Sequence, residues 1–364
     1  MFKRILTLLV IVSIFTSCVE KRDLSKNIVV THILSNPDGL HPFNDNSIMR
    51  SFIFNYTQKS LIRLDLKSLE YVPSLAKELA EISKDGLRYT FELRDDVRWD
   101  DGSPISAEDV LFTTKLQLCP LTDNAQIRGN YTSVIKSIEI DKENPRRFTM
   151  IAKDKHVSNA TIFSEIWIQQ KAYWDPTGIL DDLTFEDIHA TNFKEKESWS
   201  EWFNHFNHGD NRYKPNNLVG LGPYQVSEWE TGSYITVTKK ENWWGEKDSS
   251  IYNQNNPEEI IFKIITDDAA VFLSLKSEEL DVTNRIGTSK LTKLQNHEYF
   301  NQAYHSDFMN QYSYNYLGMN MRPDGIKRKA FFDDVSVRRA MAYLTPVDEI
   351  VEVILHDKGS RQVS

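Results

Sequence analysis

The turn and capping residues between positions 97 and 113 constrain the fold of this chain more than any other stretch. Asp101-Gly102 is a turn pair, because glycine adopts a positive φ at no steric cost. Ser106 and Asp109 have the spacing of a capping box, in which two residues occupy free backbone N–H groups at a helix start. The segment therefore predicts the end of a strand, a tight turn and a helix over residues 107–118.

The rest of the chain predicts strands and helices that follow one another in an α/β fold. Asp85-Gly86 and Thr231-Gly232 predict two hairpins, of residues 81–83 with 88–93 and of residues 224–229 with 234–239. We expect a third hairpin of 133–140 with 146–152, strands at 28–34, 61–64 and 260–265, and a loop at 211–217. Helices are expected at 47–56, 75–79, 197–206, 267–277, 336–344 and 347–356.

The N-terminus has the pattern of an export signal. Lys3-Arg4 precede an apolar run at residues 5–15, which is too short for a membrane-spanning helix of about 20 residues. Cys18 follows small residues at the end of this run, as in a bacterial lipobox. We predict a signal peptide at 1–17, lipidation of Cys18 and a tether at 18–27. The alternative is an ordinary signal peptide with an incidental cysteine.

The net charge and the cysteine and histidine residues argue against several classes of function. The formal net charge of −9 becomes −11 without residues 1–17, which carry two bases and no acid, and this disfavours binding of nucleic acid. Cys119 is the second of only two cysteines, and we expect it to be a small buried apolar side chain. His205 and His208 are three residues apart, but no nearby cysteine or acid triad supports a metal site. We expect no metal, no cofactor and no catalysis.

Several scattered motifs resemble, in the right order, those of the family 5 extracellular solute-binding proteins, the oligopeptide, dipeptide and nickel receptors of ABC importers. The segment at 97–112 is one of them. Gly39-Leu40-His41-Pro42-Phe43 is similar to a family loop that has Asp where His41 stands. The others are Pro73-Ser74-Leu75-Ala76, residues 85–94, Gly220-Leu221-Gly222-Pro223-Tyr224, Asn242-Trp243-Trp244-Gly245, Leu317-Gly318-Met319-Asn320 and residues 332–340.

The resemblance implies a two-lobed periplasmic-binding-protein-like fold, type II and cluster C-like, with the second lobe incomplete in this chain. It implies a first-lobe core at 28–66 and 186–285, an additional subdomain at 67–185, and the start of the second lobe at 286–364. It also implies a monomeric envelope lipoprotein that closes on an oligopeptide and delivers it to an ABC permease and ATPase. Two alternatives stay open: the same fold binding nickel chelate, haem or a sugar, and an envelope interaction, sensing or chaperone protein without a transporter.

Two short segments are the candidate ligand contacts. Ser35, Asn36, Pro37 and Asp38 follow the first strand, where the family resemblance implies a loop that lines the cleft. The same residues also suit a plain turn. Asn320 and Met321 lie at the end of the lobe-crossing strand that the resemblance implies at 317–320, and they face either the cleft or a core. Tyr312, Tyr314 and Tyr316 alternate, so they share one face of a strand, and we expect that face to be lobe core rather than cleft.

Overall fold

The computed structural model describes residues 26–45, 47–164, 166–213, 218–309, 314–322 and 331–361. The chain divides into two compact units, Met1–Thr266 (unit 1) and Asp267–Ser364 (unit 2). The expected signal peptide, Cys18, most of the tether and Tyr312 lie outside the described residues. The lobe boundaries expected from the sequence stay a prediction.

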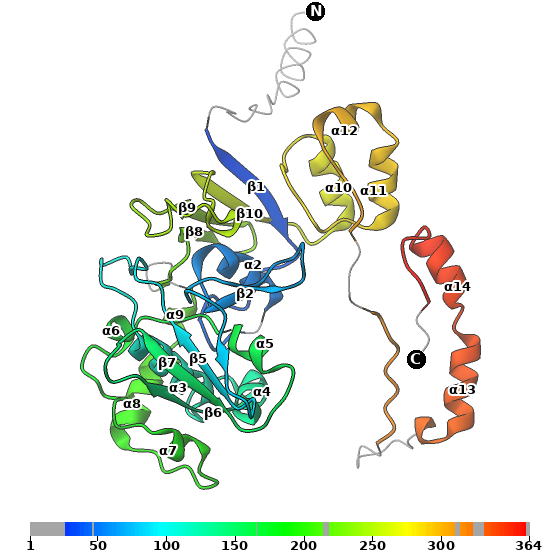
Figure 1. The fold of residues 1–364 in the computed structure, drawn as a ribbon. Helices are drawn as coiled ribbons and strands as arrows, with labels where there is room; N and C mark the ends of the chain where they lie inside the picture. Colours follow the sequence, from blue (N-terminus) through cyan, green and yellow to red (C-terminus); the bar gives the residue numbers. More distant parts are fainter. Residues whose placement is uncertain are drawn as a thin grey trace, which may run out of the picture. The chain divides into compact units, whose positions relative to one another are not determined.

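The first sheet of unit 1 joins the start of the chain to residues more than two hundred positions later (Figure 1). Its order is β1-β10-β9-β8, with β1 parallel to β10 and the other pairs antiparallel. The strands are β1 (Ile28–Ile33), β8 (Tyr224–Glu230), β9 (Tyr234–Lys239) and β10 (Glu259–Ile264). Gly232 has a φ of +80° in the β8–β9 turn, so the Thr231-Gly232 hairpin is confirmed.

The second four-stranded sheet has the order β4-β5-β7-β6. It contains the other two predicted hairpins, and Gly86 turns the first of them at a φ of +73°. Its strands are β4 (Glu81–Ile82), β5 (Arg88–Glu92), β6 (Ile135–Ile140) and β7 (Arg147–Ala152). A separate pair is formed by β2 (Ile62–Leu64) and β3 (Tyr71–Pro73).

Helix α3 (Ala107–Leu118) lies against the β4–β7 sheet at the predicted position (Figure 1). The side chains of α3 and of α8 (Glu197–Phe206) enter the larger of two hydrophobic clusters, which also includes Leu61 and Leu221. Helix α8 contributes Trp199, Trp202, Phe203 and Phe206 from one face, as its aromatic spacing predicts. The smaller cluster joins α2 (Ile48–Thr57) to the inner face of the β1 sheet.

Three local expectations in unit 1 are wrong. Residues 75–79 form no helical turn, because Ala76 pairs with Leu93 and the Lys77 N–H donates to the Glu92 carbonyl. Helix α4 (Ala125–Val134) occupies the beginning of a segment predicted as strand. Helix α9 (Asp210–Tyr213) replaces the first part of the predicted loop at 211–217. The remaining short helices are α5 (Asn159–Ser164), α6 (Lys171–Trp174), α7 (Phe185–His189) and η2 (Ile251–Asn253).

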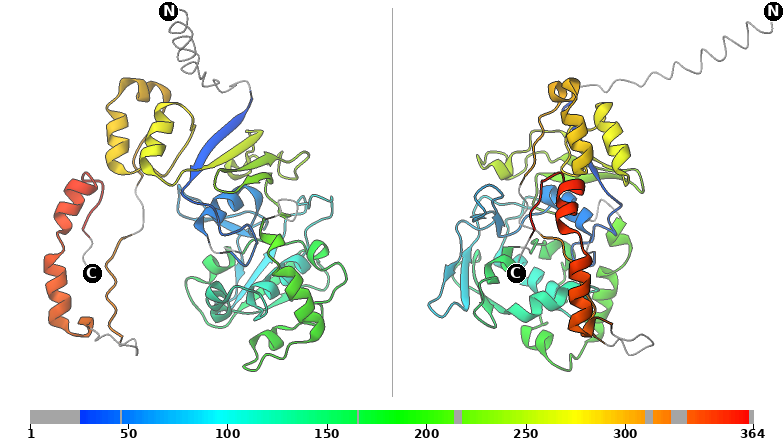
Figure 2. Two further views of the ribbon diagram at one scale, coloured as in Figure 1. Left: turned by 180° about the vertical axis from the view of Figure 1, so that it is seen from behind. Right: turned by 90° about the vertical axis from the view of Figure 1, so that its right-hand side faces the viewer.

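The regular secondary structure in the described residues of unit 2 is helical. Helices α10 (Asp268–Lys276), α11 (Thr288–Gln295) and α12 (Glu298–Ala303) lie side by side (Figure 2). Asp267 caps α10 by accepting from the N–H groups of Ala269 and Ala270. Further along lie η3 (Phe331–Asp333), α13 (Val335–Leu344), α14 (Val347–Glu349) and η4 (Ile350–Ile354).

Candidate ligand-binding site

The loop that follows β1 places the four candidate residues at or near the surface of unit 1. Ser35 and Asp38 are exposed, Asn36 is half-buried and Pro37 is buried. The loop is held by two distant segments, because Asn36 Oδ1 accepts from the Gly232 N–H at 3.2 Å and the Asp38 carbonyl accepts from the Tyr213 hydroxyl at 3.0 Å. These two hydrogen bonds hold the Asn36 side chain and the Asp38 carbonyl in place.

A buried polar network anchors the loop from below. The Leu40 N–H donates to the Arg212 carbonyl, and the His41 N–H donates to Asp45 Oδ2 at 2.7 Å. Gly39 leaves no room for a side chain, because a Cβ there would overlap the Asp45 carboxylate. Burial raises the pKa of Asp45, while the His41 N–H and the nearby Arg212 act in the opposite direction.

His41 is fully buried, and its hydrogen bonds define its tautomer. Nδ1 accepts from the N–H groups of Phe43 and Asn44, both at 3.1 Å. Nε2 lies 2.8 Å from the Phe206 carbonyl and must therefore carry the proton. Burial lowers the pKa of His41 to about 3, so the ring is neutral and both of its nitrogens are engaged. Where the family resemblance implies an Asp, this chain uses an uncharged acceptor for the same turn.

Arg50 completes the anchor. Its Nη1 donates to the carbonyls of His41 and Pro42 at 2.9 and 3.3 Å, and its guanidinium lies over the rings of Phe54 and Trp167. Burial lowers the pKa of Arg50 to about 10, which leaves it charged at neutral pH. These contacts join α2 to the part of the loop at His41 and Pro42.

The segment at 97–113 is scaffold. Gly102 turns the chain at a φ of +83°, as predicted. The Asp109 carboxylate accepts from the Ser106 N–H at 2.9 Å and from the Lys171 N–H at 2.8 Å, and the Trp99 indole N–H approaches it at 3.4 Å. Burial raises the pKa of Asp109, while these hydrogen bonds lower it. The predicted capping residue therefore also ties the helix to a segment sixty positions later.

The Gly220-Leu221-Gly222 motif is scaffold as well. A Cβ at either glycine would overlap backbone carbonyl oxygens at the end of α2, so the close approach requires glycine. The Leu221 carbonyl accepts from the indole N–H groups of both Trp243 and Trp244, at 2.9 and 3.0 Å. Two motifs predicted separately from the sequence thus meet at one oxygen atom.

Asn320 and Met321, the second candidate pair, lie in unit 2 and are exposed. The expected lobe-crossing strand is wrong for its described part, because residues 314–321 have no regular secondary structure. A strand requires a hydrogen-bonded neighbour, and no described strand pairs with this segment. Tyr314 and Tyr316 are exposed rather than packed in a core.

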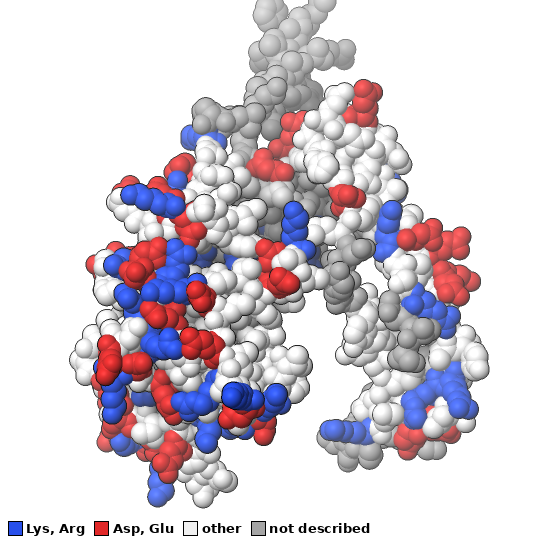
Figure 3. Space-filling model, in the orientation of Figure 1, with Lys and Arg blue, Asp and Glu red and all other residues white. Residues whose placement is uncertain are grey.

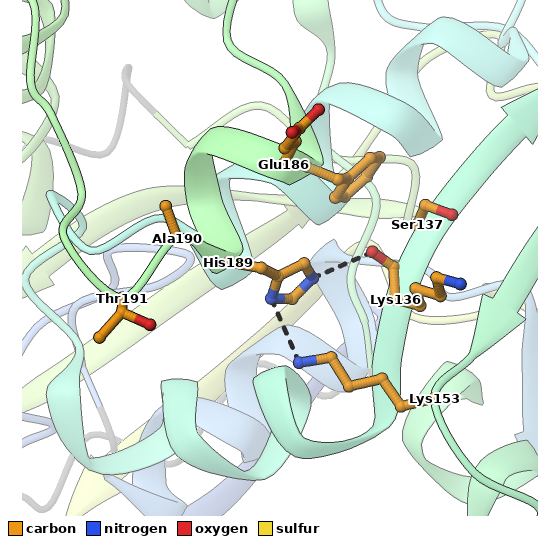
Figure 4. Close-up of a pocket in the computed structure, with 8 residues that line it drawn as sticks. Lys136, Ser137, Lys153, Glu186, His189, Ala190 and Thr191 are labelled. Atoms are coloured by element: carbon orange, nitrogen blue, oxygen red, sulfur yellow. Dashed lines mark hydrogen bonds between the residues drawn. The ribbon is translucent and has the colours of Figure 1, made fainter.

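Sequence reasoning missed an open groove of about 820 Å³ beside β6 and α7 (Figure 4). His189 Nε2 donates to the Lys136 carbonyl at 2.9 Å, so Nδ1 accepts from Lys153 Nζ at 3.3 Å. Burial and Lys153 lower the pKa of His189. With both ring nitrogens engaged, the histidine is not free to act as a general base. The groove is lined by Lys136, Ser137, Lys153, Phe185, Glu186, His189, Ala190 and Thr191, none of them a candidate from the sequence.

The described residues contain no group of three His, Cys, Asp or Glu side chains suited to a metal ion. His208 Nδ1 lies 3.9 Å from Asp210 Oδ2.

Cys119 is free and buried, as predicted. None of the described helices is both long and apolar enough to cross a membrane. Acidic and basic side chains are interspersed over the visible face of unit 1 (Figure 3).

Comparison with known proteins identifies the class. Residues 70–364 match the model of the bacterial extracellular solute-binding proteins, family 5 middle, and the chain belongs to this family. The family consists of solute-binding proteins, in agreement with the prediction that the chain is not an enzyme.

The chain is also similar to individual proteins of this family, at low sequence identity. The oligopeptide-binding protein OppA of Bacillus subtilis is 27% identical over 247 residues, which cover 66% of this chain and 42% of OppA. The dipeptide-binding protein of Escherichia coli is 21% identical over 305 residues, which cover 82% of this chain and 50% of that protein. The chain thus spans about half the length of these relatives.

Solved structures confirm the α/β periplasmic-binding-protein fold. DppA of Helicobacter pylori in complex with the peptide STSA matches with a TM-score of 0.67 at 17% identity, over 92% of this chain and 60% of that one. NikZ of Campylobacter jejuni in complex with Ni(L-His) matches with a TM-score of 0.63 at 23% identity, over 91% and 56%. At these identities the likeness concerns the fold alone.

Proposed function

We propose that this protein is the receptor of an ABC importer and that it captures oligopeptides. The observation that carries the proposal is the family match over residues 70–364, together with relatives named for binding oligopeptides and dipeptides. In this proposal Cys18 holds the lipid anchor in the cell envelope, and a monomeric protein delivers its ligand to the permease and ATPase.

The loop after β1 is the proposed first contact. An extended peptide is recognised through its backbone N–H and C=O groups, and loops with fixed polar groups supply partners for them. Ser35 and Asp38 are exposed on a loop whose ends are hydrogen-bonded to Gly232 and Tyr213. Because this loop is already ordered, binding loses little conformational entropy there.

Asn320 and Met321 are the proposed contacts from the second lobe. A ligand that touches both proposed lobes favours the closed arrangement by the difference between its affinities for the closed and open states. Closure by a hinge is the proposed mechanism, and the closed form is the one that docks on the permease.

Mass spectrometry of the solute that co-purifies with the full-length protein tests the ligand class. The protein is purified without denaturant, unfolded in acid, and the released small molecules are identified. A heterogeneous mixture of short peptides supports the proposal. A single metal complex, a haem or a sugar would overturn it in favour of another ligand on the same fold.

A bulky substitution tests the loop. Ser35→Trp places an indole on the exposed surface of the loop, and Ser133→Trp places one on the exposed face of α4 as a matched control. Binding is measured by titration calorimetry with a casein-digest peptide mixture. We expect Ser35→Trp to weaken binding at least tenfold and Ser133→Trp to leave it unchanged. Equal affinities of the two variants would remove the loop from the site.

The neighbouring genes test the partner. Two permease genes and two ATPase genes beside this one support import, and their absence supports an envelope interaction or sensing role.

A further inference from the structure

A small, partly enclosed cavity of about 30 Å³ lies beside Pro42 and Phe43, in the loop that joins β1 to α2. It is bounded by the loop, by α2, by the end of α3, by α4 and by the segment before α6. The lining residues are Pro42, Phe43, Arg50, Gln117, Asn124, Tyr131 and Trp167. A volume of this size accommodates one water molecule.

Three polar atoms on the side chains that line this cavity are buried without a hydrogen-bond partner. They are Arg50 Nε, Gln117 Nε2 and Asn124 Oδ1. Each of the three residues is only 6% exposed, so bulk water does not reach them. Buried polar groups in folded proteins are almost always hydrogen-bonded, and ordered water supplies the partner where protein does not.

The donor and acceptor roles of the three atoms determine which molecule or ion can occupy the cavity. Arg50 Nε and Gln117 Nε2 are donors, whereas Asn124 Oδ1 is an acceptor. The guest must therefore accept two hydrogen bonds and donate one. A halide ion would leave the Asn124 oxygen unpaired, and a cation would be repelled by the Arg50 guanidinium. Water both donates and accepts, and it fits the volume.

We propose that this cavity is a binding site for a single structural water molecule that bridges Arg50, Gln117 and Asn124. Arg50 already fixes the loop through the carbonyls of His41 and Pro42. The water extends this connection to the last turn of α3 and to the N-cap of α4. The bound water thus connects the loop after β1 to α3 and α4. This connection does not depend on which solute the protein binds.

A high-resolution crystal structure of the full chain, with and without a bromide soak, tests the proposal. We expect one electron-density peak within hydrogen-bond distance of Arg50 Nε, Gln117 Nε2 and Asn124 Oδ1, and no anomalous signal there after the soak. An empty cavity would overturn the proposal. An anomalous bromide peak in the cavity would also overturn it, because it would identify an anion site.

A variant gives a second, independent readout. Gln117→Met keeps the length of the side chain and removes one donor, and Gln225→Met on the exposed side of β8 is the control. We expect the water peak to be lost or to fall to less than half its wild-type occupancy in Gln117→Met and to be unchanged in Gln225→Met. Full occupancy in both variants would exclude Gln117 from the site. These outcomes do not depend on the identity of the transported solute.

Discussion

Acidification should destabilise unit 1 through His41. In the folded protein the neutral ring accepts two backbone N–H groups through Nδ1 and donates through Nε2 to Phe206. Protonation of Nδ1 would remove the acceptor of the Phe43 and Asn44 N–H groups and place an N–H of the ring against these two donors. The pKa of His41 falls from 6.5 to about 3, so the unfolded chain binds more protons than the folded one between these values. The contribution of His41 to stability is therefore fully present above pH 6.5 and is lost as the pH falls from 6.5 towards 3.

The magnitude follows from the shift. One pKa unit corresponds to 1.36 kcal/mol. A pH of about 4.5 lies roughly two units below the ordinary pKa of 6.5, so His41 should lower the free energy of unfolding there by roughly 3 kcal/mol. Asp45 acts in the opposite direction, because its raised pKa favours the folded state in acid. His41→Asn isolates the histidine, because Asn offers an uncharged acceptor to the same N–H groups and does not titrate.

Urea unfolding followed by tryptophan fluorescence is the assay, since all eight tryptophans lie in unit 1. We expect His41→Asn to be about 1–3 kcal/mol less stable than wild type at neutral pH, because it loses the hydrogen bond to Phe206. Between pH 6.5 and 4.5 it should lose roughly 3 kcal/mol less than wild type. His208→Asn, at an exposed position, should keep the wild-type pH dependence. Identical pH dependence of wild type and His41→Asn would refute the assignment of a buried neutral histidine.

Three further substitutions or reactions test the scaffold. Gly222→Ala forces a Cβ against the Tyr56 carbonyl and should cost roughly 2–4 kcal/mol in urea unfolding, whereas Gly209→Ala, with open space, should stay within about 1 kcal/mol of wild type; equal effects would contradict the close approach. Asp109→Ala leaves the N–H groups of Ser106 and Lys171 unpaired and should cost about 2–4 kcal/mol, against about 0.5 kcal/mol or less for Glu108→Ala; a neutral Asp109→Ala would show that the carboxylate is dispensable. Burial raises the pKa of the Cys119 thiol to about 11, so Cys119 should react with a thiol reagent only as fast as unit 1 unfolds, and rapid labelling of the native protein would contradict its burial.

Local signals account for the parts of the fold that the sequence predicted well. The hairpins at Gly86 and Gly232 and the helix over 107–118 depend on residues adjacent in the chain, so their patterns are legible without tertiary contacts. The expected turn at 75–79 failed because its backbone groups pair with the end of β5, a partner that no local pattern reveals. Helix α4 was missed because its polar sequence carries no apolar stripe.

The candidate site was predictable only at its surface. The family resemblance singled out the loop with Ser35 and Asp38, its turn residues also suited a plain turn, and the structure leaves both residues exposed. The anchor beneath it was not predictable, because the partner of His41 is Phe206, 165 positions away, and the partner of Leu40 is Arg212. The groove at His189 was missed for the same reason, since its lining comes from three separate segments of the chain.

The parallel pairing of β1 with β10 has a consequence for biosynthesis. Ile28 pairs with Glu259, which follows it by 231 positions, so the first strand to leave the ribosome has no partner until nearly all of unit 1 has been made. Such long-range closure slows folding, because the entropy of a large loop is lost before the contacts form. The nascent chain therefore cannot complete its first sheet until most of unit 1 has been synthesised, whereas the β4–β7 sheet has all of its strands much earlier.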